Sequence, residues 1–257
     1  MDMIALAPGF SVSRLSFGCG SLHHLGDASA PRLLNEAVEL GFSHFDTAPS
    51  YGFGLGEWRL APLLRTHRDL TVTTKVGLAA MGPPASSWAG MLARKIAGRL
   101  FRPLARPVRL ETVAAARASL DASLRRLGRE RVDVLMIHEP DPDLLGSGEW
   151  RRWIEEEQAA GRVRQYGLAG TQARVRQCIA AGVSWRVQTE AHPAAGVQAL
   201  QAAGATVDFL YSPISARAAG NSPTMALKAV AERFPECSLI VATRRIERLR
   251  ELSGALS

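Results

Sequence analysis

Residues 43–58 read SHFDTAPSYGFGLGEW: a short apolar run ends in Asp46, and Tyr51 follows in a glycine-rich turn. Similar short runs recur along the chain, and an amphipathic helical pattern follows each of them. Eight such pairs are typical of an α/β fold of the (β/α)₈ TIM barrel type. The predicted strands are Arg14–Gly18, Ser43–Asp46, Thr71–Lys75, Val132–His138, Val163–Ala169, Trp185–Thr189, Thr206–Tyr211 and Ser238–Ala242.

A doubly wound sheet is the main structural alternative to the barrel. Such a sheet typically carries a GxGxxG turn after its first strand. Here the first predicted strand runs into FGCGSLHH and the second into DTAPSYGFGLGEW, and neither matches that pattern. Barrels of about 250 residues form one domain. The sequence therefore favours a single barrel domain over residues 1–257.

Composition narrows the class of protein. The chain is 47% hydrophobic and 21% charged, and its apolar runs fall short of the roughly 18 residues that a membrane helix needs. Its start lacks the basic and apolar regions of a signal peptide. Cys19, Cys178 and Cys237 are scattered without CxxC spacing, which predicts neither a disulfide framework nor a metal site. We therefore expect a cytoplasmic protein.

The formal net charge of +7 is concentrated in one segment. Residues 94–109 carry six basic residues and no acidic one, and the rest of the chain is close to neutral. A local cluster of this kind does not describe a nucleic-acid-binding domain. The basic residues are Arg94, Lys95, Arg99, Arg102, Arg106 and Arg109.

The same basic residues lie in a long insertion at 77–109, rich in Pro, Gly and Arg, between the third predicted strand and the next helix. A loop in this position stands over the mouth of a barrel. Within it Leu92, Ile96, Leu100 and Leu104 recur every four residues, which predicts an amphipathic helix broken at Pro103. Three interpretations remain open: a solvated cover, a basic rim for an anionic substrate, or a contact with a membrane surface or acidic partner. Trp88 and Phe101 are candidates to line a pocket beneath it.

Asp46, Lys75 and His138 end the second, third and fourth predicted strands, and Tyr51 follows the second. Taken singly, three of them have an ordinary explanation: Asp46 as a cap, Lys75 as a solvated lysine and His138 as a core histidine. The carboxyl ends of barrel strands meet at one mouth, so we expect the four side chains to converge there.

Convergence would give these residues a proton-transfer role. A phenol has a pKa near 10, and a good general acid at neutral pH needs a value lower by about 2–3 pH units. An ammonium ion about 4 Å away supplies roughly that effect, so Lys75 is expected to lower the pKa of Tyr51. Asp46 would keep the buried Lys75 charged, and His138 would donate to a substrate oxygen. An alternative is a lyase or isomerase that uses Lys75 as a Schiff-base nucleophile.

These motifs resemble the aldo-keto reductase family: GFSHFDTAPSYG with Asp46 and Tyr51, TVTTKV with Lys75, and VDVLMIHEP with His138. The resemblance covers nearly the whole chain. It implies a barrel without a Rossmann unit, NADPH across the mouth, and reduction of a small aldehyde or ketone. Tyr51 would be the proton donor, tuned by Lys75 and Asp46, with His138 orienting the carbonyl.

The same resemblance implies a set of cofactor-binding residues. Tyr211 would stack on the nicotinamide, Gln188 would contact its carboxamide, and Ser212 would reach the pyrophosphate. The segment IVATRRIERLREL would hold the adenosine phosphate, with Thr243, Arg244 and Arg248 on the 2′-phosphate. Glu251 would lie near the adenine. The full set is Gly20, Ser21, Asp46, Gln188, Tyr211, Ser212, Thr243, Arg244, Arg248 and Glu251.

The sequence departs from the family pattern in several places. Ala169 and Gly170 stand where the family usually has Ser-Asn on the carboxamide, and Leu252 replaces an Asn of the phosphate clamp. The usual C-terminal loop of the substrate pocket has no counterpart before Ser257, which makes 77–109 the expected lid. A nucleotide-binding barrel with little turnover and a regulatory role is the alternative function. We expect a monomer or weak oligomer.

Overall fold

A computed structural model describes residues 1–80, 84–100, 107–183, 185–215 and 222–256. Eight parallel strands close into a barrel, with each strand hydrogen-bonded to the next in chain order and the last to the first. This confirms the predicted (β/α)₈ barrel, and every strand lies within one residue of its predicted bounds. The strands are β3 (Leu15–Gly18), β4 (His44–Asp46), β5 (Thr71–Val76), β8 (Val132–His138), β9 (Val163–Ala169), β10 (Arg186–Glu190), β11 (Thr206–Tyr211) and β12 (Ser238–Val241).

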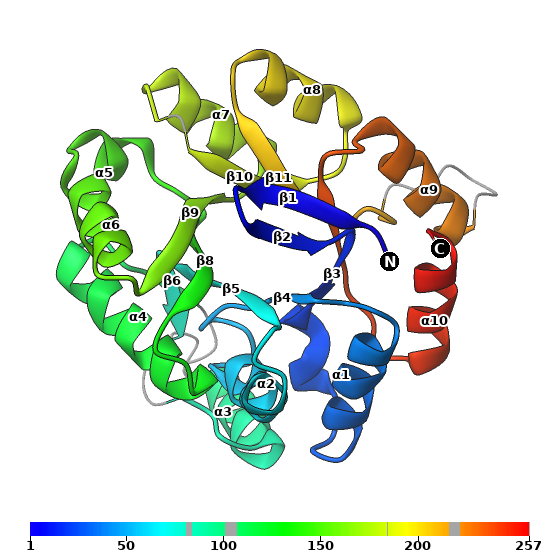
Figure 1. Ribbon diagram of the computed structural model, residues 1–257. Coiled ribbons are helices and arrows are strands. Elements are labelled where there is room, and N and C mark those ends of the chain that lie inside the picture. The colour runs from blue at the N-terminus through cyan, green and yellow to red at the C-terminus, as the bar shows by residue number, and fades with distance from the viewer. Residues whose placement is uncertain (81–83, 101–106, 184, 216–221, 257) are drawn as a thin grey trace.

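Helices surround the barrel (Figure 1) and bury their apolar faces against the strands. Several begin at a hydroxyl or carboxylate cap; Thr112, for example, accepts from the backbone N–H of Ala115 at 3.2 Å. The helical elements are the 3₁₀ turn η1 (Cys19–His24), α1 (Ser29–Glu39), α2 (Leu55–Thr66), α3 (Trp88–Leu100), α4 (Val113–Leu127), α5 (Pro142–Gly146), α6 (Glu149–Ala159), α7 (Gln172–Ala180), α8 (Ala194–Ala202), α9 (Pro223–Arg233) and α10 (Ile246–Gly254). None of these helices is both long enough and apolar enough to cross a bilayer.

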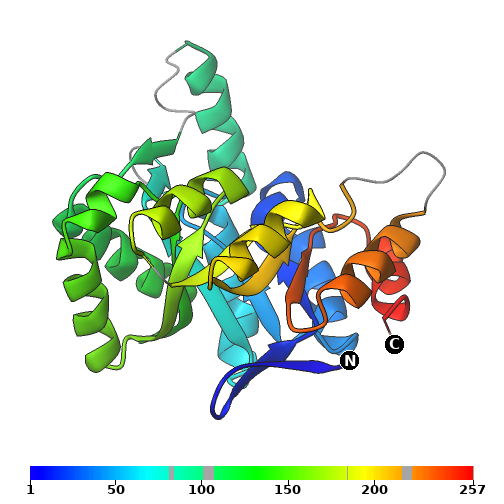
Figure 2. The ribbon, with the colours of Figure 1, turned by 90° about the horizontal axis from the view of Figure 1, so that it is seen from above.

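An antiparallel hairpin closes one end of the barrel, and it was not predicted. Its strands are β1 (Met3–Ala7) and β2 (Phe10–Ser13). Phe10 and Val12 are buried and join the side chains inside the barrel, including Met136 and Phe209. Figures 1 and 2 show the hairpin crossing the end from which the barrel strands start. The opposite end, where the strands finish, carries the site.

The described part of the 77–109 insertion contains regular secondary structure. Strands β6 (Leu78–Ala80) and β7 (Pro107–Arg109) form a second antiparallel hairpin. The predicted helix is present as α3, which projects from the mouth end of the barrel in Figure 2. Its buried Met91 packs with Phe53 and Leu55, while Trp88, Leu92 and Ile96 are exposed. Phe101, Arg102, Pro103, Leu104 and Arg106 lie outside the described residues.

His44 lies on barrel strand β4 and is fully buried, so the pH dependence of stability tests its burial in the barrel. The buried ring contacts the Thr71 hydroxyl through Nδ1 and the Thr73 hydroxyl through Nε2, both at 2.8 Å. Burial, and then Lys75, lower the pKa of His44 to about 3.

The unfolded chain therefore takes up a proton at His44 between about pH 6.5 and pH 3 while the folded chain does not. As the pH is lowered through this range, we expect this one group to reduce the free energy of unfolding by about 1.4 kcal/mol per pH unit. Urea unfolding from pH 7.5 to 5, compared with His44→Gln, measures the difference in slope. Equal slopes for the two proteins would contradict the assignment.

Candidate active site

A cavity of about 430 Å³ opens at the carboxyl ends of the barrel strands. The four residues predicted to do chemistry, Asp46, Tyr51, Lys75 and His138, all line it. They come from β4, the turn after it, β5 and β8. The expected convergence at one mouth is thus present in the geometry.

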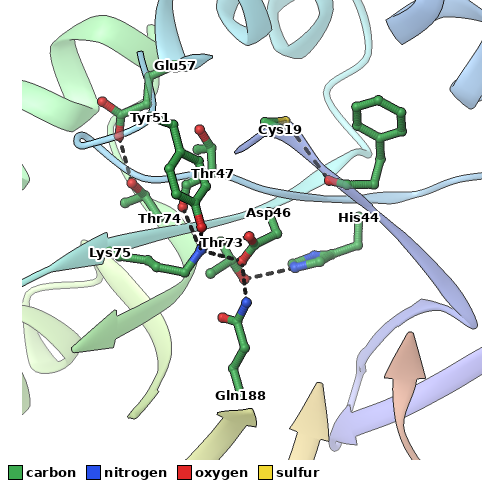
Figure 3. A network of polar contacts seen from close by, with 11 residues as sticks. Cys19, His44, Asp46, Thr47, Tyr51, Glu57, Thr73, Thr74, Lys75 and Gln188 are labelled. Atoms are coloured by element: carbon green, nitrogen blue, oxygen red, sulfur yellow. Dashed lines mark hydrogen bonds and ion pairs between the residues drawn. The ribbon is translucent and has the colours of Figure 1, made fainter. Parts of the chain in front are cut away.

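Lys75 is the centre of the polar network in the cavity. Its ammonium donates to both carboxylate oxygens of Asp46 at 2.7 Å and to the carbonyl of Thr47 at 3.0 Å. It also donates to the Tyr51 phenol oxygen at 3.3 Å. In Figure 3 the Tyr51 phenol and the Gln188 amide approach this pair from opposite sides. Because the Tyr51 oxygen accepts from Lys75, its own proton is free to be donated elsewhere.

Burial acts on both ends of this contact. It lowers the pKa of a lysine, but Asp46 and Tyr51 more than compensate, so the pKa of Lys75 lies above its ordinary value and the ammonium stays charged. Burial also raises the pKa of Tyr51, and Lys75 only opposes that rise. The predicted lowering of the Tyr51 pKa is therefore wrong for this structure. The main reason is desolvation of the phenol by burial; Asp46 adds to the rise, and Lys75 opposes it without overcoming it.

His138 faces Tyr51 across the cavity. Their ring centroids are 6.2 Å apart and the ring planes are perpendicular. Burial and Lys75 lower the pKa of His138 to about 3, so the imidazole is neutral near pH 7. Its buried Nδ1 has no hydrogen-bond partner among the described residues. A neutral ring offers one N–H and one lone pair to a ligand.

A buried carboxylate fixes the start of α2, the helix that follows the Tyr51 turn. Glu57 is fully buried and accepts from the Thr74 hydroxyl and from Nε of Arg126, both at 2.6 Å. Thr74 precedes Lys75 on β5, so this contact ties α2 to the strand that carries the ammonium. The turn also needs Gly52, whose φ is +59° and where a Cβ would lie 2.3 Å from the Cβ of His23.

Besides Asp46, four of the predicted cofactor residues line the same cavity: Gly20, Gln188, Tyr211 and Ser212. Gln188 donates through Nε2 to Asp46 at 2.9 Å, and its buried Oε1 has no partner among the described residues. The Tyr211 hydroxyl donates to Glu190 at 2.8 Å.

A second hollow adjoins the first and shares Ile214 and Ala242 with it. The predicted phosphate residues Thr243, Arg244 and Arg248 line it. Arg248 is held by the Glu251 carboxylate at 2.8 and 2.9 Å, so Glu251 positions this arginine and does not itself line the hollow. Ser21 lines neither space in the described structure, although its buried hydroxyl is without a partner there.

The structure also places the residues that depart from the family pattern and those expected to line a pocket at the mouth. Ala169 and Gly170 do line the cavity, and a Cβ at Gly170 would lie only 3.1 Å from Pro140, which leaves little room for an asparagine. Trp88 does not line it and is exposed, contrary to expectation. Glu139, absent from the predicted set, lines the cavity next to His138. The described residues hold no cluster of His, Cys, Asp or Glu suited to a metal ion.

The model of the aldo/keto reductase family matches residues 14–201, which include β3 to β10 and all four residues of the Tyr51 network. The chain belongs to this family. A D-threo-aldose 1-dehydrogenase from a Pseudomonas species is 31% identical over 192 residues, covering 64% of this chain and 52% of the relative. A 6-dehydroglucose reductase from Agrobacterium fabrum is 27% identical over 179 residues, covering 66% and 54%. This family member thus spans about half the length of the curated relatives it matches.

Solved structures agree on the fold. An aldo-keto reductase from Bacillus halodurans in its holo form superposes with a TM-score of 0.75 at 19% identity, covering 100% of this chain and 90% of the other. A glycerol dehydrogenase from Gluconobacter oxydans gives 0.73 at 17% identity, with the same coverage. At this identity the likeness shows the barrel fold alone.

The buried Asp46–Lys75 pair gives a stability test. Removing one partner leaves the other charge buried and unpaired, which typically costs about 3–5 kcal/mol. We expect Asp46→Asn and Lys75→Met each to lower the free energy of unfolding by about that much. The double variant should lose clearly less than the sum, as measured by urea unfolding in a double-mutant cycle. Simple additivity would show that the two charges do not depend on each other.

Proposed function

We propose that this family member catalyses the NADPH-dependent reduction of an aldehyde or ketone to an alcohol. The observation that carries the proposal is the contact of the Lys75 ammonium with both the Asp46 carboxylate and the Tyr51 hydroxyl at the floor of an open cavity. This arrangement leaves the phenol proton available and supplies a positive charge beside the oxygen that would lose it.

The residues present fit a nicotinamide dinucleotide. The unpartnered Oε1 of Gln188 is a buried acceptor for the carboxamide N–H₂. The adjoining hollow offers Arg244, which is exposed and forms no ion pair with a described residue, together with Arg248 and Thr243. Arginine suits a phosphate because its donors can bind two oxygens at once. These residues support NADPH over NADH.

When bound, NADPH supplies the hydride for the carbonyl carbon. The neutral His138 would donate its N–H to the carbonyl oxygen and hold it toward Tyr51. Tyr51 would then protonate that oxygen, and the Lys75 ammonium, 3.3 Å from the phenol oxygen, would stabilise the resulting tyrosinate. Running the same proton transfer backwards gives oxidation of an alcohol.

Two alternatives are less well supported. A Schiff-base lyase needs a neutral lysine, whereas Asp46, Thr47 and Tyr51 occupy the three N–H donors of Lys75 and keep it charged. A regulatory nucleotide-binding barrel would need no intact proton donor, and this site retains one. Replacement of Tyr51 separates the two functions.

We expect Tyr51→Phe to lower kcat/KM for aldehydes by at least about 100-fold, because general acid catalysis contributes roughly that much. NADPH binding, followed by cofactor fluorescence, should stay within about threefold. Tyr166→Phe is the matched control, since Tyr166 packs edge-on against Trp185 and does not line the cavity. Equal NADPH consumption by the wild type and Tyr51→Phe with a panel of aldehydes would remove the catalytic proposal.

The phosphate hollow gives a separate prediction. We expect Arg244→Ala to weaken NADPH binding by about 10- to 100-fold, as for the loss of a charged hydrogen bond, and to leave NADH binding nearly unchanged. Titration by fluorescence measures both constants. Arg176→Ala, exposed on α7, is the control for loss of charge alone. Equal losses for both cofactors would show that Arg244 does not read the 2′-phosphate.

A further inference from the structure

Glu139 has an unusual position directly after β8. Glu139 follows His138 and lines the same cavity as Tyr51 and Lys75. Its φ is +50°, in the left-handed region that residues other than glycine seldom adopt. Such strain persists only where the surroundings impose it, and it gathers at functional sites.

The surroundings of Glu139 do impose this conformation. Its backbone N–H donates to the carbonyl of Ala169 at 2.7 Å, and its own carbonyl accepts from Arg109 at 2.6 Å. On the other side Gly77 lies so close that a Cβ there would be 2.8 Å from the carbonyl of His138. Three segments therefore fix the backbone of Glu139, and with it the origin of the side chain.

The Glu139 carboxylate itself is not used by the fold. It is half-buried and has no hydrogen bond or ion pair with any described residue. Glu190, its acidic neighbour, is different, because its oxygens accept from the Tyr211 hydroxyl, the Thr189 hydroxyl and the Gln172 backbone.

The groups around Glu139 act on its carboxyl in both directions. Burial and then Glu190 raise its pKa, Arg174 and Arg109 lower it, and the net result is a pKa above the ordinary value. Among the described lining residues Lys75 is the one cation, and Asp46 already neutralises it. Glu139 therefore offers this pocket a hydrogen-bond acceptor, and no described lining cation is left unpaired to bind the carboxylate of a substrate.

We propose that Glu139 is a specificity-determining residue whose carboxylate accepts a hydrogen bond from a hydroxyl group of the carbonyl substrate. The substrate class is then a hydroxylated aldehyde or ketone in place of an anionic one. This inference rests on the proposed reductase function and deepens it. The hydrogen-bonded backbone fixes the position of Glu139, and its carboxyl oxygens, which no described protein donor uses, supply the acceptor that distinguishes hydroxylated substrates.

The test compares two aldehydes of the same carbon number, glyceraldehyde with two hydroxyls and propanal with none, at saturating NADPH. We expect Glu139→Ala to lower the ratio of kcat/KM for glyceraldehyde to that for propanal by roughly 10- to 100-fold. Glu139→Gln should retain part of the ratio, because its amide oxygen still accepts, and should improve the relative rate on anionic succinic semialdehyde. Glu130→Ala, exposed before the other end of β8, is the matched control and should not change the ratio.

An unchanged ratio in Glu139→Ala, or an equal fall for both aldehydes, would overturn the assignment. If the wild type reduces no aldehyde of the panel, the proposed function fails and binding decides the inference. Saturation-transfer NMR with xylitol and 1-pentanol serves this purpose in the presence of NADPH. Xylitol signals lost in Glu139→Ala but kept in Glu130→Ala would support hydroxyl recognition by Glu139; equal signals in all three proteins would refute it.

Discussion

The buried Lys75 ammonium, bound to both oxygens of Asp46, is the interaction on which the site depends. Taking an ammonium ion out of water is costly, and only a close carboxylate makes its burial tolerable. The pair in turn requires β4 and β5 to be neighbours in register, as they are, with Asp46 beside Thr73. The strand order of the barrel therefore brings the two opposite charges together.

Asp46 and Lys75 together place no net charge beside Tyr51 and His138. Burial keeps the phenol protonated and the imidazole uncharged. Lys75 therefore does not bring the pKa of Tyr51 below its ordinary value in this structure. It limits the rise that burial causes. The charge of Lys75 would matter most when the tyrosinate forms, since an anion then lies 3.3 Å from the ammonium.

The strands, the three polar residues at their ends and Tyr51 in the turn after β4 could be predicted because runs such as Val132–His138 are apolar, short and bounded by turn residues. The pKa of Tyr51 could not, since it depends on burial that no local pattern encodes. The β1–β2 hairpin had a signal that was overlooked: Ile4 and Leu6 alternate with exposed residues before a Pro-Gly turn. Glu139 lies next to His138 in sequence, but its conformation is set by Ala169 and Arg109 from distant segments.

The two hollows at the mouth differ in charge, and this difference has a consequence for recognition. Arg244, Arg245 and Arg248 line one, whereas Glu139 is a carboxyl residue of the other that has no ion-pair partner among the described residues. Since the spaces share Ile214 and Ala242, one elongated ligand would reach both. In the proposed dinucleotide complex the 2′-phosphate would lie beside the arginines and the uncharged carboxamide beside Gln188. The arginines and Gln188 would therefore favour a single orientation of the cofactor.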